Sequence, residues 1–326
     1  MAALTSLAVI PGQAQASARS GSHYTTGDPT LTIRHLGKTY ANGVRALDDV
    51  SLDIPRGMFG LLGPNGAGKS SLMRTLATLQ EADSGSATLE VADGKSVDVL
   101  READLLRRQL GYLPQDFGVY PKVSARDLLN HFAVLKGITA RGRRREVVDG
   151  LLQQVNLWEV RKRKLGTYSG GMRQRFGIAQ ALLGDPRLVI VDEPTAGLDP
   201  EERNRFLNLL AEIGENVAVI LSTHIVEDVT DLCSSMAIMN KGQVLLTGKP
   251  ADAIAALTQQ VWRKRIDKHA LANYEARHTV LSTRLVAGSP VIHVFSGERP
   301  EEGFEPVAPG LEDVYFQRLR LHAHAA

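Results

Sequence analysis

Three short, mostly aliphatic runs dominate the hydrophobic pattern of this chain: residues 58–62, 188–191 and 217–221. Each run is followed at once by glycine or polar residues. Continuous apolar runs of this length are typical of central strands in a parallel sheet that helices cover on both faces. The pattern therefore predicts an α/β fold.

Weaker strand signals lie on either side of these runs. Residues 31–33 begin an alternation of apolar and polar side chains, and residues 46–54 form a second strand pattern after the turn signal Asn42-Gly43. Residues 237–246 consist of two apolar stretches around an Asn-Lys-Gly turn, which predicts a hairpin.

Apolar residues at helical spacing follow the first run and recur from about residue 101 to residue 184. We therefore expect a helix after residues 58–62 and a helical subdomain over about residues 112–180. The positions that carry this pattern are Leu72, Met73, Leu76, Ala77, Leu79, Leu105, Leu106, Leu110, Leu128, Leu129, Phe132, Leu135, Val147, Val148, Leu151 and Leu152.

The ends of the chain differ in composition from its middle. Residues 1–28 are rich in Ala, Ser, Gly and Gln and predict a disordered tail; a targeting segment is the alternative, although no Lys or Arg precedes Arg19. Residues 249–326 contain several prolines and glycines, which predict a small accessory domain of short strands and loops. Residues 29–248 are left as the main domain.

Net charge and cysteine content limit the classes of function that this chain can have. Lys+Arg 38 against Asp+Glu 36 leaves a net charge of +2, so no strong global field favours nucleic acid. The single cysteine, Cys233, excludes a disulfide within the chain, fits a reducing compartment and is expected to be a buried apolar residue. No stretch approaches the roughly 18 apolar residues of a membrane-spanning helix.

The run at 58–62 leads into a glycine-rich loop that fits the pattern G-x-x-x-x-G-K-[ST]. Glycines let the backbone curl so that its N–H groups converge on a phosphate, and the following helix adds its positive N-terminal end. The lysine places a cation on the β- and γ-phosphates, and the serine hydroxyl can bind Mg²⁺. The loop residues are Gly63, Pro64, Asn65, Gly66, Ala67, Gly68, Lys69 and Ser70.

Two further motifs fit the same chemistry. The run at 188–191 ends in Asp192-Glu193, where Asp192 can hold Mg²⁺ and Glu193 can orient or deprotonate a water. A Ser169-Gly170-Gly171 run before a helical pattern can form a second anion site; the alternative is a plain helix N-cap at Ser169.

Together with Gln115, the segment 197–199 and His224, these motifs occur in the order and spacing of ATP-binding-cassette (ABC) nucleotide-binding domains, which the chain resembles over about residues 31–248. The resemblance implies a P-loop NTPase fold with a helical subdomain, the cofactors ATP and Mg²⁺, and ATP hydrolysis. The segment 197–199 is Gly197-Leu198-Asp199.

The resemblance also implies roles for single residues. Lys69, Gln115, Glu193 and His224 correspond to the catalytic group, and Ser70, Gln115 and Asp192 to the Mg²⁺ ligands. ATP would lie on the glycine-rich loop and Ser71, with Tyr40 stacking on adenine, although Tyr40 could instead be a core tyrosine. Ser169, Gly170, Gly171 and Asp199 would act on the ATP of a second subunit, which implies a dimer; a homodimer is expected. The segment 168–172 corresponds to the family's signature motif, and it departs from the commonest residues of that motif at Tyr168 and Met172. These two departures leave the Ser169 hydroxyl and the glycine N–H groups in place.

Two segments are similar to ATP-binding subunits of the drug or antibiotic exporter (ABC-2) type: residues 111–121 and Leu311-Glu312-Asp313-Val314-Tyr315. This similarity implies a separate transmembrane permease as partner, no nucleic acid, and a cytoplasmic position on the inner face of the cell membrane. An importer subunit and an ABC protein acting on ribosomes or DNA are the alternatives. Basic runs at 141–145 and 161–164 indicate either solvated faces or contacts with lipid headgroups or permease loops.

Overall fold

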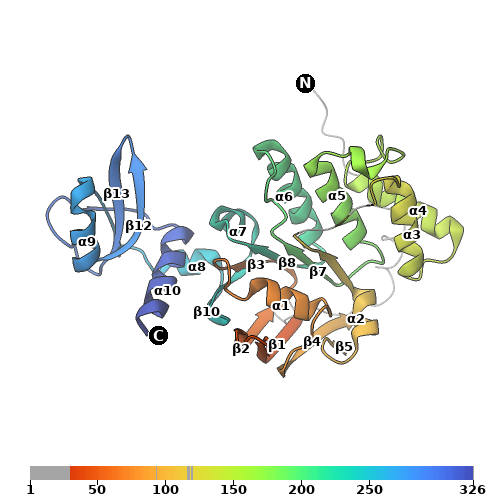
Figure 1. The fold of residues 1–326 in the computed structure, drawn as a ribbon, viewed down its shortest axis with the longest axis horizontal. Helices are drawn as coiled ribbons and strands as arrows, with labels where there is room; N and C mark the ends of the chain where they lie inside the picture. Colours follow the sequence, from red (N-terminus) through yellow and green to blue (C-terminus); the bar gives the residue numbers. More distant parts are fainter. Residues whose placement is uncertain (1–29, 93, 116–117, 119, 326) are drawn as a thin grey trace.

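The computed structural model describes residues 30–92, 94–115, 118 and 120–325 of the chain (Figure 1). The predicted tail, residues 1–28, lies outside the described residues. None of the helices in the described part of the chain combines the length and the apolar character that a bilayer crossing requires.

A six-stranded sheet lies at the centre of the main domain, in the order β10-β9-β3-β8-β7-β6. Neighbouring strands from β9 to β6 are parallel, and β10 pairs antiparallel with β9. Every residue of β7 and β8 is buried, which explains their continuous apolar runs. The strands are β3 (Gly57–Leu62), β6 (Leu110–Leu113), β7 (Leu188–Asp192), β8 (Ala218–Thr223), β9 (Ser235–Asn240) and β10 (Gln243–Gly248).

The helical pattern that the sequence shows from about residue 101 to residue 184 gave a wrong prediction at β6. Leu110 follows the helical spacing of Leu105 and Leu106, but it begins the edge strand that pairs with β7. The close approach of Gly111 to the end of α5 explains why a glycine stands in this strand: a Cβ at Gly111 would lie 2.2 Å from the carbonyl oxygen of Ala181.

A second, antiparallel sheet in the order β2-β1-β4-β5 lies beside the first (Figure 1). Its strands are β1 (Leu31–Thr39), β2 (Arg45–Ile54), β4 (Ser84–Ala92) and β5 (Lys95–Asp98). Helix α1 (Lys69–Leu76) shares one hydrophobic core with this sheet and with β3, β7 and β8. Both predicted strands at the start of the domain are confirmed, whereas β4 and β5 were not predicted.

The helical part of the main domain packs on the other side of the central sheet. Its apolar residues share a second core with α6 and α7. These helices are α3 (Ala125–Leu135), α4 (Arg141–Gln154), α5 (Gly170–Ala181), α6 (Pro200–Gly214) and α7 (Val226–Leu232). Helix α2 (Ala103–Gln109) instead packs through Leu106 in the core that α1 shares with the antiparallel sheet.

The C-terminal segment forms a small sheet, β12-β13-β11-β14, flanked by helices (Figure 1). The predicted short strands are present, but the sequence did not predict the last element, α10, which is a helix of 15 residues. Leu311, Val314 and Tyr315 of α10 are buried in the same core as the central sheet. The elements are α8 (Pro250–Ala255), β11 (Val261–Arg265), α9 (Leu271–Arg277), β12 (Thr279–Val286), β13 (Ser289–Phe295), β14 (Glu305–Pro306) and α10 (Leu311–Ala325).

Candidate functional site

The glycine-rich loop forms a tight turn between β3 and α1. Gly66 and Gly68 have φ angles of 80° and 102°, which side chains with a Cβ rarely adopt. A Cβ at Gly68 would lie 2.4 Å from the carbonyl oxygen of Ala46, and one at Gly63 would lie 2.5 Å from that of Met239. The glycines are therefore required by the backbone path that turns the loop into the N-terminus of α1.

Lys69, the first residue of α1, is buried with its ammonium group against this loop. Its Nζ donates hydrogen bonds to the carbonyl oxygens of Gly63 at 2.6 Å and Pro64 at 3.3 Å. Burial lowers the pKa of Lys69, while Glu193 and Asp192 oppose that shift. An ammonium group in so little water interacts strongly with any anion on the loop.

Asp192 is the last residue of β7 and is buried beside Lys69. Burial raises the pKa of its carboxyl group, while the nearby hydroxyl groups of Ser222 and Ser70 oppose that shift. Among the described residues, no donor makes a hydrogen bond of ordinary geometry to its Oδ1 atom. A buried carboxylate oxygen without a donor is costly unless a cation or water satisfies it. This oxygen and the exposed hydroxyl of Ser70 are hard oxygen ligands of the type that Mg²⁺ binds, so the residues present fit that ion.

Glu193 lies where four segments meet. Its carboxylate is 3.3 Å from Gln115 Nε2, 3.3 Å from His224 Nδ1 and 3.9 Å from Lys69 Nζ. Its φ of 45° is unusual for a residue other than glycine, and its N–H group donates to the Ser222 carbonyl oxygen on β8 at 2.9 Å. The structure therefore brings together residues that are far apart in the sequence.

Tyr40 stands at the end of β1 and is half-buried. Its hydroxyl group lies 3.0 Å from Ser71 Oγ and 3.0 Å from Gln80 Oε1. These contacts fix the ring beside α1, next to the glycine-rich loop. Sequence reasoning missed Gln80, which lies outside every motif and joins the site only through folding.

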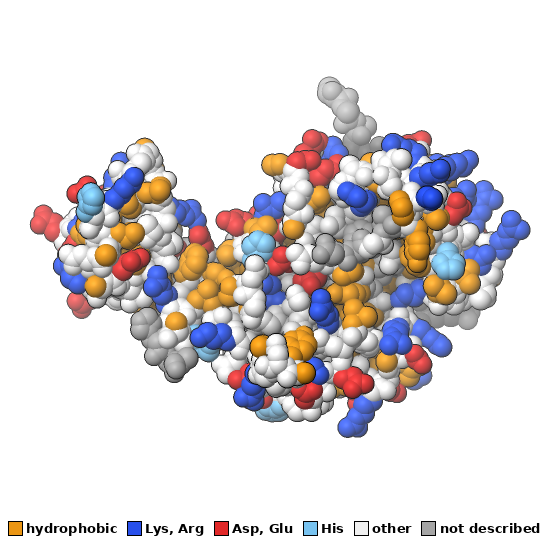
Figure 2. All heavy atoms as spheres, viewed as in Figure 1, with side chains coloured by type: hydrophobic (Ala, Val, Ile, Leu, Met, Phe, Trp, Pro, Cys, Tyr) orange, Lys and Arg blue, Asp and Glu red, His pale blue; other side chains and the backbone are white. Residues whose placement is uncertain are grey.

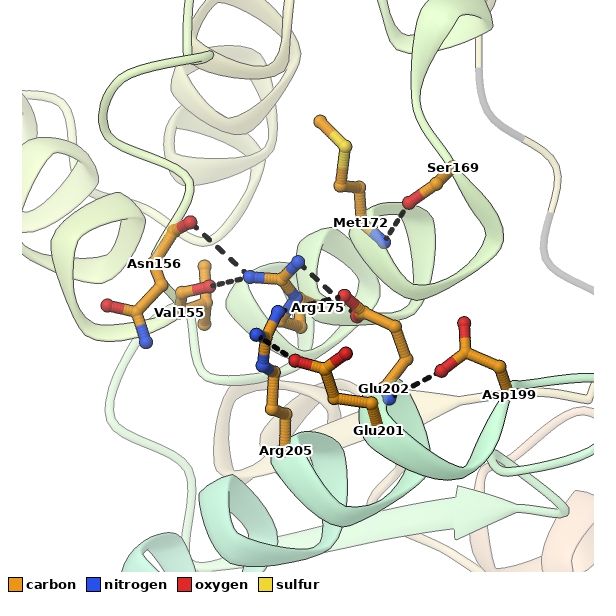
Figure 3. Close-up of polar contacts among 9 residues, drawn as sticks. All are labelled: Val155, Asn156, Ser169, Met172, Arg175, Asp199, Glu201, Glu202 and Arg205. Carbon is orange, nitrogen blue, oxygen red and sulfur yellow. Dashed lines mark hydrogen bonds and ion pairs between the residues drawn. The ribbon is translucent and has the colours of Figure 1, made fainter.

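The signature segment and Asp199 form helix caps on α5 and α6. Ser169 Oγ accepts from Met172 N at 3.2 Å, and Asp199 Oδ1 accepts from Glu202 N at 2.9 Å (Figure 3). Ser169 is thus an N-cap, as the alternative of a plain cap predicted. Ser169 and Gly170 are exposed at the N-terminal end of α5, whereas Gly171 is buried. Within the described residues, no hydrogen bond or ion pair joins either cap to the glycine-rich loop.

A buried network beyond the predicted residues supports the segment after Glu193. The side chain of Asp228 on α7 is fully buried and accepts from Thr195 Oγ1 at 3.2 Å and from Arg203 Nη2 at 2.6 Å. Sequence reasoning missed this network because its members are isolated polar residues without motif spacing.

The basic runs lie at opposite ends of the α3–α4 pair. Figure 2 shows Lys and Arg side chains gathered over this part of the molecule. Two of them have local structural roles: Arg144 Nε donates to Asn130 Oδ1 at 2.7 Å, and Arg161 stacks on Trp158 at 3.5 Å. For the other exposed Lys and Arg side chains of these runs, both interpretations stay predictions: solvated faces, or contacts with lipid headgroups or permease loops.

Comparison with known proteins agrees with this site. The family model described as ABC transporter matches residues 47–196. The daunorubicin/doxorubicin resistance ATP-binding protein DrrA of Streptomyces peucetius is 36% identical over 245 residues, which cover 73% of this chain and 71% of DrrA. The linearmycin resistance ATP-binding protein LnrL of Bacillus subtilis (strain 168) is 35% identical over 229 residues, which cover 70% of this chain and 71% of LnrL.

The fold is also similar to a solved dimer of the ATP-binding cassette MJ0796 in a post-hydrolysis state bound to ADP and Pi. The TM-score is 0.59, with 24% identity over 67% of this chain and 98% of that one. The fold and site thus define an ATP-binding cassette ATPase. The chain belongs to the ABC transporter family and is an ATP-binding, ATP-hydrolysing transporter subunit, as the motifs predicted.

Proposed function

We propose that this chain energises export of a drug- or antibiotic-like compound through a separate transmembrane permease, acting from the cytoplasmic face of the membrane. The names of DrrA and LnrL, each similar over most of its length, support export of such compounds. The segment Leu311–Tyr315, which resembles a segment of exporter-type subunits, supports the exporter type over the importer alternative.

The proposed mechanism of ATP hydrolysis rests on one observation, the contact of Gln115, His224 and Lys69 with Glu193. In this proposal Lys69 and the loop N–H groups bind the β- and γ-phosphates, and His224 contacts the γ-phosphate. Glu193 accepts a proton from the attacking water as the bond to the β–γ bridging oxygen breaks. Asp192, Ser70 and Gln115 would hold Mg²⁺, which supplies charge neutralisation on the phosphates.

We also propose that the working unit is a dimer of two copies of this chain. Ser169, Gly170, Gly171 and Asp199 have no polar contact with the chain's own glycine-rich loop within the described residues. Each nucleotide would then be bound by the loop and Tyr40 of one copy and by the signature and Asp199 of its partner.

Glu193→Gln tests the catalytic assignment. Turnover is expected to fall by a factor on the order of 10² or more, because the water loses its positioned base, while ATP still binds. Phosphate release and nucleotide affinity would be measured together. Glu212→Gln, the same chemical change at an exposed position of α6, is the control, and near wild-type turnover of Glu193→Gln would contradict the assignment.

The transport proposal is tested by purifying tagged Glu193→Gln from detergent-solubilised membranes in MgATP. Recovery of a multi-span membrane protein supports a separate permease, and transport of a labelled drug by the reconstituted pair gives the direction. Ribosomes or DNA in place of a membrane protein would contradict the proposal and favour a role outside transport.

A further inference from the structure

Arg175 occupies the face of α5 that is turned towards α6. Gly171 and Arg175 are one helical turn apart and therefore lie on the same side of α5. Arg175 Nη1 reaches the carbonyl oxygens of Val155 at 3.5 Å and Asn156 at 3.4 Å, just after α4 ends. A cation at the carbonyl end of a helix is favourable, so Arg175 connects α4 to the signature helix.

Glu202 completes this connection from α6. Its Oε2 atom lies 3.4 Å from Arg175 Nη2, and its Oε1 atom lies 3.3 Å from Arg205 Nη1 (Figure 3). Only 20% of the Glu202 side chain and 13% of the Arg175 side chain are exposed, so solvent screens this pair weakly. A Cβ at Gly171 would lie 2.1 Å from Glu202 Oε2, so the bare glycine backbone makes room for the carboxylate.

The position of Glu202 on its own helix makes this contact informative. Asp199 and Glu202 are the N-cap and N3 residues of α6, the positions of a capping box. A glutamate at N3 ordinarily reaches back to the N-cap N–H group. Here the carboxylate points instead to α5, while its own N–H group binds Asp199 Oδ1.

We propose that Arg175 and Glu202 are positioning residues that hold the Ser169–Gly171 turn and Asp199 in one fixed arrangement. The link runs from Ser169, the N-cap of α5, through Arg175 and Glu202 to Asp199, the N-cap of α6. The inference rests on the proposed dimer, because these two caps would close on the ATP of the partner copy. Loss of the link leaves each helix folded and each glycine-rich loop intact, but it lets the two caps move independently.

The test is the isosteric change Glu202→Gln in a Glu193→Gln background, which slows hydrolysis so that an ATP-bound dimer can accumulate. The dimer dissociation constant in MgATP would be measured by sedimentation velocity. We expect Glu202→Gln to weaken the dimer roughly tenfold, the usual size of a coupling between two sites. The affinity of the isolated chain for ATP on its own glycine-rich loop should be unchanged, whereas a general loss of structure would weaken that affinity together with the dimer.

Glu201→Gln in the same background is the matched control. It removes the same charge one residue earlier, but Glu201 is 76% exposed, and its only ion pair among the described residues is with Arg205. Equal dimer affinity in the Glu202 and Glu201 variants would overturn the inference while leaving the proposed dimer intact. Failure of Glu193→Gln itself to dimerise with ATP would instead contradict the proposed function. Arg175→Lys, which keeps the charge but cannot reach Glu202 and the α4 carbonyl groups together, should weaken the dimer as Glu202→Gln does.

Discussion

At the scale of single residues, the site keeps charged groups where burial opposes their charge. Asp192 and Lys69 are each only 5% exposed. Burial raises the pKa of Asp192 and lowers the pKa of Lys69, so in both cases it favours the neutral form. Such shifts cost folding free energy and are typical of functional sites. The residues were predictable because each belongs to a motif, but their burial was not.

Asp192→Asn should therefore stabilise the nucleotide-free protein. Because the folded-state pKa of Asp192 is raised, ionisation destabilises the fold at pH values above that pKa, and the cost disappears below the ordinary pKa of aspartate. We expect the unfolding temperature to rise at pH 7.5. The gain should shrink as the pH is lowered. Asp231→Asn, at an exposed carboxylate, should change little, and a destabilised Asp192→Asn protein would refute the reasoning.

Cys233 gives a second test at this scale. Burial, reinforced by Asp228, raises the pKa of its thiol to about 12. Because only the thiolate reacts, labelling of the native protein at pH 8 should be at least about a hundredfold slower than labelling in urea. Absorbance of a disulfide reagent measures both rates. Similar rates would mean that the thiol is accessible, contrary to the expectation that Cys233 is a buried apolar residue.

At the scale of elements, hydrophobic periodicity identified the strands and helices that are buried. It missed strands whose formation depends on pairing with neighbouring strands. The runs in β7 and β8 are apolar throughout because helices cover both faces of the sheet. In contrast, β4 and β5 carry mostly small and polar residues between a few buried apolar ones such as Leu89 and Val97, and β5 lies at the edge of the antiparallel sheet. The strand β6 resembled a helix until its pairing with β7 was known.

Ser169 combines a structural role and a proposed binding role, and two substitutions separate them. Ser169→Ala removes the cap of α5 and should lower the free energy of unfolding by about 1 kcal/mol. Ser169→Asn keeps a good cap and should keep that stability. Both should weaken ATP-driven dimerisation of the Glu193→Gln protein, as followed by sedimentation. If Ser169→Asn dimerised normally, the hydroxyl group would have no role beyond capping.

At the scale of the whole molecule, α10 fastens the C-terminal sheet to the main domain. Leu311 and Val314 share the main core, while Asp313 accepts from His293 on β13, whose Nδ1 lies 2.8 Å away. One helix therefore contacts both parts of the chain. A segment that the sequence predicted to form strands and loops therefore depends on a helix that packs against both the C-terminal sheet and the main domain.

Leu311→Ala should loosen this attachment. Removing a buried leucine side chain costs about 3 kcal/mol, so limited proteolysis of residues 249–326 should become faster and the unfolding temperature should fall. Leu321→Ala changes the same residue type on the same helix, where 49% of the side chain is exposed, and should leave both unchanged. Equal protease resistance of the two variants would show that α10 does not fasten the sheet.

The sequence by itself determined the class of fold, the family and the residues that we propose contact phosphate. These features rest on local spacing, since glycines, a lysine and an acidic strand end carry their chemistry wherever the chain places them. Only the tertiary structure decided that Gln115 and His224 meet at Glu193, that Gln80 anchors Tyr40, and that Glu202 turns from its own helix to Arg175. Those contacts depend on packing between elements that are distant in the chain, and no local pattern encodes such distances.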